Sequence, residues 1–388
     1  MELHDYKDTI HRCFRCGYCK YTSDFSHYNC PMYHKYRTDS HMPGGILWLI
    51  RAVMTEELEA TPAIAEILFG CTMCGNCCNK CPMEFHEKIV DMITAARMYF
   101  VEKQIVPPMV RKYLMNMINS GNPWNKSHAE RGRWAEGSVI RRYRKGDDFL
   151  FYVGDMGSYD ERAIKTSIAL GELFYGAGMN FGILGCDEQS DGNDVGKMGE
   201  RDLLSYLAEE NIGIFQQNGV EAVCTLSPHA YHSIKNLYPP MGGSYAVYHY
   251  TQLLWDLMQK GRLAVTGRID KKIAFHDPCL LGRWNLEYEA PRELLKAIPG
   301  TELAELPRNR SNALCCGGGG GNCYTDVLGS GRESPSRVRV REAYENGIEI
   351  LAVACPTCML MLEDALKEEE LWGKMEIKDV AEILMEAR

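Results

Sequence analysis

The 388-residue chain has no long apolar run, no excess of basic charge and no secretion-signal pattern. Its most apolar stretch, GGILWLI at 44–50, is far shorter than the roughly 20 residues that cross a membrane. The formal net charge of −9 argues against nucleic acid as the main partner. The N-terminus, MELHDYKDTIHRC, lacks the basic and then apolar order of a signal peptide. We therefore expect a cytoplasmic protein with no transmembrane segment of its own, peripheral to a membrane only through a partner.

Cysteine, by contrast, is abundant, with 17 residues in the chain. The cytosol keeps thiols reduced, so a disulfide framework does not account for them. Thiolates are soft ligands that suit zinc and iron–sulfur clusters. The spacing of the cysteines is therefore the main guide to function.

Two groups of thiols lie in the first 85 residues, and each has the form CxxCxxC followed by Cys-Pro. Structural zinc sites use paired CxxC units, whereas this triple spacing is the ferredoxin pattern for a [4Fe–4S] cluster. In two-cluster ferredoxins the fourth thiolate of each cluster comes from the other motif. Crossed ligation of this kind gives one set of Cys13, Cys16, Cys19 and Cys81, and a second set of Cys71, Cys74, Cys77 and Cys30. The adjacent Cys78 falls outside the spacing and is interpreted as a packing residue.

The sequence between and after these motifs favours helices. Apolar residues at 46, 47, 50, 53 and 54 follow a helical period, and 84–104 has the same character before Pro107 and Pro108 stop it. We predict a helical ferredoxin domain over 1–120. A polar stretch at 121–147, with the basic run Arg141 to Lys145, is interpreted as a solvated linker, the alternative being a docking surface for an acidic partner.

Five more thiols occur in the last third, within HDPC at 276–279, CC at 315–316 and CPTC at 355–358. The glycines after the Cys-Cys pair have no Cβ to keep a cluster away, and their N–H groups can donate to sulfur. Pro356 suits the first turn of a helix, whose dipole favours an anion. We predict a cluster site whose thiols and cradle are Cys279, Cys315, Cys316, Cys355, Cys358, Gly317, Gly318 and Gly319. Structural zinc and a phosphate loop made by the glycines are the alternatives, although no GK[ST] follows.

From residue 148 onward, strand-like runs alternate with helical stretches, which predicts α/β domains with parallel sheets. The strand-like runs fall at 148–154, 180–185, 221–226, 271–276 and 348–354. The region 148–265 aligns with 266–388 as an internal repeat at an offset of 124 to 128 residues. The whole chain is thus expected to be an α+β multidomain protein with two pseudo-repeats.

The first repeat has lost every ligand of the second. Asp155 aligns with Cys279, Ser190 and Asp191 with the Cys-Cys pair, and Ser227 and Ala230 with Cys355 and Cys358. We therefore predict that 148–265 holds no cluster. The alternative is that Asp155 and Asp191 supply oxygen ligands to some other site.

Several residues near these motifs remain ambiguous. Cys186 and Cys224 are interpreted as buried structural cysteines, and Cys323 as a packing residue. Arg283, Arg308 and Arg310 are interpreted as surface charge. His276 and Asp277 either hydrogen-bond near the cluster or simply close the strand.

The five-thiol pattern resembles the cysteine-rich CCG domain of the heterodisulfide reductase family. In that family five thiolates hold one [4Fe–4S] centre, which is non-cubane in the best-understood members. Nearly the whole chain resembles the membrane-associated catalytic polypeptide HdrD, in which a two-cluster module is fused to two CCG repeats. The resemblance implies two [4Fe–4S] cubanes and one further [4Fe–4S] cluster, with either geometry open for the last.

The full reductase has two CCG clusters side by side, whereas this chain has ligands for one. We therefore expect an electron-transfer subunit of an anaerobic redox complex. Its implied partner is a flavoprotein, either HdrA-like or electron-transferring, or a CoA-thioester reductase of the benzoyl-CoA type. The alternatives are a heterodisulfide or thiol-disulfide reductase that uses the single CCG cluster, and a zinc-binding scaffold.

Overall fold

The computed structural model describes residues 2–388, and its N-terminal part is helical, as predicted. Proline occupies the first turn of several of these helices, where its missing N–H costs nothing. One helix ends before Pro107 and a new one begins at Pro108. The helices are α1 (Lys7–His11), α2 (Pro31–Tyr36), α3 (Pro43–Met54), α4 (Pro62–Gly70), α5 (Asn76–Lys80), α6 (Ile89–Glu102) and α7 (Pro108–Ser120).

The rest of the chain forms two four-stranded parallel sheets with equivalent strand orders, β2-β1-β3-β4 and β6-β5-β7-β8. This confirms the predicted α/β repeat. The first repeat contains β1 (Phe149–Tyr152), α8 (Gly154–Tyr159), α9 (Glu161–Gly176), β2 (Phe181–Gly182), α10 (Asn193–Lys197), α11 (Arg201–Asn218), β3 (Ala222–Thr225), α12 (Pro228–His232), β4 (Ala246–His249) and α13 (Tyr250–Gln259). The second contains β5 (Lys272–Phe275), α14 (Gly282–Asn285), α15 (Glu289–Lys296), β6 (Glu302–Ala304), α16 (Asn322–Thr325), α17 (Pro335–Glu345), β7 (Ile350–Val353), α18 (Pro356–Glu368), β8 (Glu376–Asp379) and α19 (Val380–Glu386).

The five strand-like runs correspond to β1, β2, β3, β5 and β7. The inner strands β1 and β7 are buried along their whole length, as expected when helices cover both faces of a parallel sheet. The sequence pattern did not predict β4, β6 and β8. These edge strands are short and carry polar or partly exposed residues, so no apolar run marks them.

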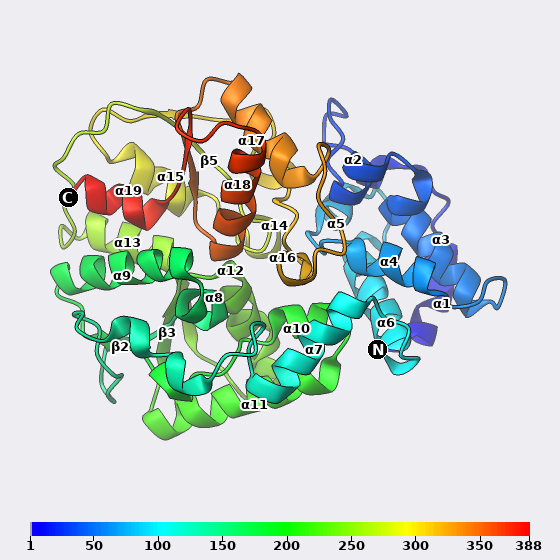
Figure 1. Cartoon of the computed structure of the whole chain (residues 1–388), viewed down its shortest axis with the longest axis horizontal. Helices are drawn as coiled ribbons and strands as arrows, with labels where there is room; N and C mark the ends of the chain where they lie inside the picture. The colour runs from blue at the N-terminus through cyan, green and yellow to red at the C-terminus, as the bar shows by residue number, and fades with distance from the viewer. Residues whose placement is uncertain (1) are drawn as a thin grey trace.

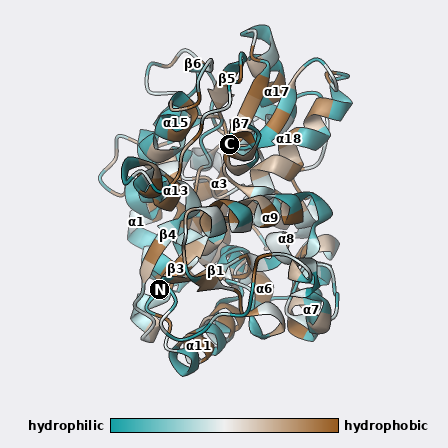
Figure 2. Cartoon of the chain, turned by 90° about the vertical axis from the view of Figure 1, so that its left-hand side faces the viewer, coloured by the Kyte–Doolittle hydropathy of each residue, from teal (hydrophilic) through white to brown (hydrophobic). Residues whose placement is uncertain are grey.

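The two repeats pack against each other through helices related by a pseudo-twofold arrangement (Figures 1 and 2). Helix α13 of the first repeat contacts α15 of the second, and α9 contacts α19. A single hydrophobic core includes residues of both sheets. Arg162 pairs with Glu363 and Glu382 across this contact at 2.6 Å each. The two repeats therefore share one hydrophobic core across their contact.

The stretch at 121–147, predicted to be a solvated linker, is fixed to the first repeat. Arg142 forms a parallel bridge with Ile183, which continues the backbone pairing beyond β2. Arg141 pairs with Asp147 at 2.6 Å, and Arg142 pairs with Asp187, so the basic run is neutralised locally. The N-terminal helices, blue to cyan in Figure 1, lie beside both repeats.

In each sheet the strands that follow the first one are added on both of its sides. In the first sheet β2 lies on one side of β1, and β3 and β4 lie on the other; the second sheet is arranged in the same way. The loops that follow β1 and β3, or β5 and β7, therefore open at one edge, which is where parallel sheets bind ligands. Cys279 follows β5 and Cys355 follows β7. The fold thus brings together motifs 76 residues apart in the sequence.

Candidate metal centres

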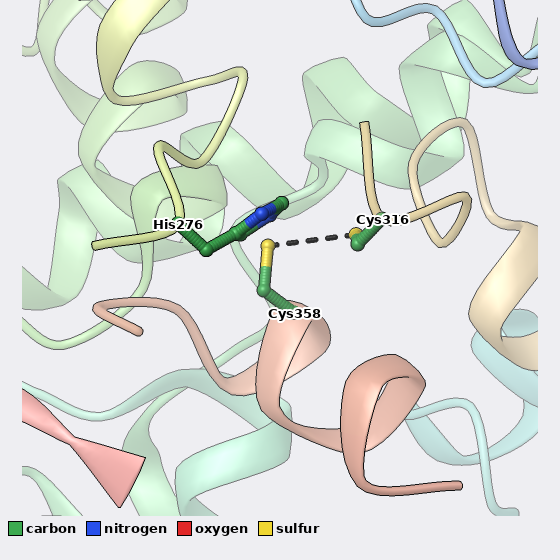
Figure 3. Close-up of side chains that lie close together, drawn as sticks. All are labelled: His276, Cys316 and Cys358. Atoms are coloured by element: carbon green, nitrogen blue, oxygen red, sulfur yellow. Dashed lines mark hydrogen bonds between the residues drawn. The ribbon is translucent and has the colours of Figure 1, made fainter. Parts of the chain in front are cut away.

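The five thiols of the second repeat converge at this edge of the sheet, and Figure 3 shows two of them, Cys316 and Cys358. Cys316 Sγ and Cys358 Sγ lie 3.5 Å apart, and both residues are buried. Hydrogen bonds from Cys315 and Cys358 hold the pKa of the Cys316 thiol well below its usual value. A hydrogen bond with Cys315 raises the pKa of Cys279 well above its usual value, because the bond stabilises the protonated thiol. A buried set of soft sulfur donors suits an iron–sulfur cluster.

The glycine loop after the Cys-Cys pair donates a hydrogen bond to sulfur and also packs closely against neighbouring residues. The Gly317 backbone N–H donates to Cys315 Sγ at 3.4 Å, as predicted for this loop. Gly317 has a φ of +94°, which a side chain would strain. A Cβ on Gly318 would lie 2.7 Å from Thr357 Cγ2, and one on Gly319 would lie 2.5 Å from the Thr72 carbonyl oxygen. The glycines therefore permit contact with the ferredoxin part as well as approach to sulfur.

The first ferredoxin set also meets in space. One pocket is lined by Cys13, Cys16, Cys19 and Cys81 together with Gly44. Burial raises the pKa of Cys19 to about 12, and the neighbouring thiols of this set act in the same direction. Cys81 comes from the second motif, so the juxtaposition matches crossed ligation.

The second ferredoxin set is more deeply buried. Cys30 packs in one small apolar cluster with Cys71. Burial, with the thiols of Cys71 and Cys74, raises the pKa of Cys30 well above its usual range. A hydrogen bond with Cys78, followed by burial and the same two thiols, raises the pKa of Cys77 in the same way. The structure therefore places Cys30 with the motif at 71–77 rather than with its own.

The second ferredoxin set touches the five-thiol set. A hydrogen bond between the thiols of Cys74 and Cys315 raises the pKa of Cys74 well above its usual value. Arg283 bridges the same two loops, donating to the Cys74 carbonyl at 3.4 Å and to the Ser311 carbonyl at 2.9 Å. Cys74 and Cys315 also belong to one buried cluster, so the second ferredoxin set adjoins the five-thiol set.

A buried asparagine connects the two ferredoxin sets. Asn76 donates to the Cys19 carbonyl at 3.0 Å and accepts from Asn29 at 2.7 Å. Asn76 follows Cys74 and Asn29 precedes Cys30, so each asparagine is next to the second set. The three groups of thiols therefore form a row from the first ferredoxin set, through the second, to the five-thiol set.

In the first repeat, the equivalent region is a small pocket lined by Asp155, Ser190, Asp191 and Ser227, and buried ion pairs lie beside it. Arg131, from the predicted linker, is fully buried and donates to Asp155 at 2.7 Å and to Glu188 at 2.9 Å. Ser190 Oγ donates to the other oxygen of Asp155 at 2.7 Å. Within residues 2–388 the carboxylates of this repeat form no group of three donors close enough for a single ion. Asp155 and Asp191 line the same pocket, and the alternative that they supply oxygen ligands to another site stays a prediction.

The structure corrects three interpretations of single residues. Cys186 is exposed, because it lies in a surface 3₁₀ turn at Gly185–Asp187, while Cys224 is buried as predicted. Arg308 is buried and pairs with Glu342 at 2.9 Å, so it is not surface charge. Arg283 is likewise part-buried between loops. Only the tertiary contacts reveal the acceptors of these arginines.

Sequence reasoning missed two residues at the sites. His229, one residue after Pro228, hydrogen-bonds to Asp194 at 3.1 Å. Burial alone would lower its pKa, but Asp194 and the thiol of Cys355 raise it well above the usual value. Arg97 lies fully buried among carbonyls of the second ferredoxin set and of both repeats. The only sequence signal for Arg97 is a charged residue on the apolar face of a helix.

Two family models match this chain. Residues 9–85 match the 4Fe-4S dicluster domain, and residues 273–363 match the Cysteine-rich domain called CCG. No helix among residues 2–388 is both long and apolar enough to cross a membrane.

Curated relatives agree with these models. The chain is 36% identical over 337 residues to the probable iron-sulfur-binding oxidoreductase FadF of Bacillus subtilis, covering 83% of this chain and 46% of that protein. It is 29% identical over 420 residues to EtfAB:quinone oxidoreductase of Syntrophomonas wolfei, covering 97% and 58%. It thus spans about half the length of these two relatives.

A third relative matches over most of both chains. The D subunit (HdrD) of the dihydromethanophenazine:CoB--CoM heterodisulfide reductase of Methanosarcina barkeri is 30% identical over 329 residues, covering 82% of this chain and 77% of that protein. A hypothetical protein from Helicobacter pylori shares the fold, with a TM-score of 0.54 at 9% identity, covering 92% and 70%. The chain therefore belongs to the HdrD-like family of iron–sulfur oxidoreductases.

Proposed function

We propose that the chain carries electrons through three iron–sulfur sites: the two crossed ferredoxin sets and the five-thiol CCG set. As a member of its family it is an iron–sulfur electron-transfer oxidoreductase subunit; the number of clusters and their ligands are the proposal. The packing of Cys74 and Cys315 in one buried cluster carries it, because this packing brings the second and third sites side by side. Bound at these residues, the clusters would supply one-electron redox chemistry.

Iron analysis of anaerobically purified protein tests the number of sites. Three four-iron clusters give about twelve irons per chain. Four or fewer irons would contradict the proposal. An absorption spectrum separates iron–sulfur centres from a zinc scaffold, since zinc thiolates are colourless.

Three serine variants test crossed ligation. Cys30→Ser should remove the same electron paramagnetic resonance signal as Cys74→Ser, because Cys30 lies with the second set. Cys16→Ser should remove a different signal. Cys78→Ser is the matched control and should leave the iron content unchanged, since Cys78 lies outside both sets. A Cys30→Ser spectrum that matches Cys16→Ser instead would show that each motif binds its own cluster.

The first ferredoxin set is the one that reaches solvent, and we place the contact with the partner there. Cys16 is exposed, and Phe14, Tyr18 and Phe25 around it are exposed aromatic side chains. Aromatic residues are enriched where proteins dock. The partner we propose is an electron-transferring flavoprotein, because one relative is named EtfAB:quinone oxidoreductase. An HdrA-like flavoprotein or a CoA-thioester reductase would use the same face.

Rapid mixing under anaerobic conditions tests this partner. Reduced electron-transferring flavoprotein should bleach the visible absorption of the chain, and Phe14→Ser should slow the bleaching without changing the iron content. Exchange at an unchanged rate in Phe14→Ser would place the contact elsewhere. The alternative function, reduction of a heterodisulfide at the CCG site, predicts a substrate-derived radical signal when heterodisulfide is added. We expect none, because the first repeat has none of the five thiols that a second CCG cluster would need.

A further inference from the structure

The histidine of the HDPC motif lies directly beside the CCG thiols. His276 follows β5, its backbone N–H donates to the Ala352 carbonyl at 2.8 Å, and its side chain is fully buried. A ring nitrogen of His276 and the sulfur atoms of Cys316 and Cys358 all lie within 4.8 Å of one another. Figure 3 shows the ring reaching over the Cys358 sulfur. The ring is therefore placed to interact with whatever these thiols hold.

The hydrogen bonding of the ring determines which nitrogen bears the proton. Arg339 Nε donates to His276 Nδ1 at 3.3 Å, and Arg339 itself is held by the Arg308 carbonyl at 2.7 Å and by Glu342 at 2.8 Å. A guanidinium group can only donate, so Nδ1 must present its lone pair. The single N–H of the ring is consequently at Nε2.

His276 Nε2 is buried and, in the described part of the chain, has no hydrogen-bond partner. A buried donor without an acceptor is costly, so an absent acceptor is implied. A metal-ligating role for Nε2 would need its lone pair, and the proton would then move to Nδ1. The Nδ1–H would then point at the Arg339 N–H, and the two donors would have no acceptor between them. The arginine thus selects a hydrogen-bond donor at Nε2 over a ligand.

The first repeat serves as an internal comparison. The residue aligned with His276 is Tyr152, whose hydroxyl donates to the Gln189 carbonyl at 2.6 Å. The repeat that lacks the thiols therefore also lacks the histidine, and its replacement has its hydrogen bond satisfied within the protein. Of the two aligned side chains, Tyr152 has its hydrogen bond satisfied, whereas His276, beside the thiols, has a donor without an acceptor.

We propose that His276 Nε2–H donates a hydrogen bond to a sulfur of the cluster held by the five thiols, and that Arg339 positions it. This inference rests on the proposed function, since it requires a cluster at the CCG site. A hydrogen bond to cluster sulfur stabilises the more negative, reduced state and raises the reduction potential. His276 thereby raises the potential of the CCG cluster above the value that it would have without this donor.

Two variants test the donor. His276→Leu removes the N–H, while His276→Gln retains a side-chain N–H at similar reach. Each is compared with the wild type by iron content and by a redox titration followed by electron paramagnetic resonance of each cluster. We expect His276→Leu to keep its iron and to lower the potential of the CCG cluster alone. The expected change is about tenfold in the electron-transfer equilibrium, which is about 59 mV for one electron. His276→Gln should restore at least half of that shift.

Each other outcome has a distinct meaning. An unchanged CCG potential in His276→Leu at full iron content would refute the hydrogen bond. Loss of about four irons in both variants would also refute it, because it would make His276 a ligand. A wild-type protein with about eight irons and no CCG signal would refute the proposed function before any variant is compared.

Discussion

Replacement of Arg97 should affect stability more than replacement of any surface arginine. This guanidinium is fully buried on α6 and donates to backbone carbonyls only. Its acceptors are the carbonyls of Leu68 at 2.7 Å, Phe69 at 3.1 Å, Cys71 at 2.6 Å, Lys197 at 2.9 Å and Gly320 at 3.4 Å. They belong to the second ferredoxin set, the first repeat and the glycine loop. Arg97 therefore joins all three parts of the chain.

The size of the effect follows from those acceptors. Arg97→Leu removes a donor from five carbonyls, of which those of Leu68 and Phe69 keep a second donor. Each buried group left unpaired costs about 1 kcal/mol or more. Relief from burying the guanidinium charge offsets part of the loss. We expect a net destabilisation of about 3 to 5 kcal/mol, or a melting temperature lower by about 4 to 6 °C for a chain of this size. Burial lowers the pKa of Arg97 to about 10, so the side chain remains charged at neutral pH.

Thermal unfolding of the anaerobic, iron-loaded protein measures this prediction. Arg97→Lys keeps the charge with fewer donors and should lose about half as much. Arg111→Leu is the matched control, because Arg111 is exposed and makes one hydrogen bond, to the Gln104 carbonyl at 3.0 Å. The potential of the second ferredoxin cluster should also fall in Arg97→Leu, since a positive charge beside Cys71 is lost. Melting of Arg97→Leu within about 2 °C of the wild type would refute the reasoning.

Three further predictions follow from burial and close packing. Arg131→Leu should destabilise the protein by about 3 to 5 kcal/mol in chemical unfolding, because it leaves carboxylates such as Glu188 buried without a counter-charge. The double variant Arg131→Leu with Glu188→Gln should recover part of that loss. Gly319→Ala should lower the melting temperature and Gly213→Ala should not, since a Cβ at 319 meets a carbonyl oxygen at 2.5 Å and one at 213 meets nothing. Burial raises the pKa of Asp379 to about 7, so the folded state keeps a proton that the unfolded state releases above about pH 4. Stability then falls as pH rises from about 4 to 7. In melting experiments the stability of Asp379→Asn relative to the wild type should be greater at pH 8 than at pH 5. An equal difference at both pH values would contradict the shift.

The amino-acid sequence was sufficient for the elements that carry a periodic signal, and its cysteine spacing predicts thiol sets whose members lie together in the structure. The apolar runs predicted the central strands, and proline and helical period predicted the N-terminal helices. The CxxCxxC and Cys-Cys motifs were enough to group the thiols, because ligand spacing is a local property of the chain. The offset between the repeats also identified which copy had lost its thiols.

The contacts between those groups depend on packing across the whole molecule. Contact of Cys74 with Cys315 joins residues 241 positions apart, and no local pattern specifies it. Arg97 and Arg131 look like ordinary charged residues in the sequence, yet each is buried against acceptors from distant elements. The proton on His276 likewise depends on Arg339, 63 residues away. Ligand identity is local, whereas the charge, hydrogen bonding and order of the sites come from the tertiary structure.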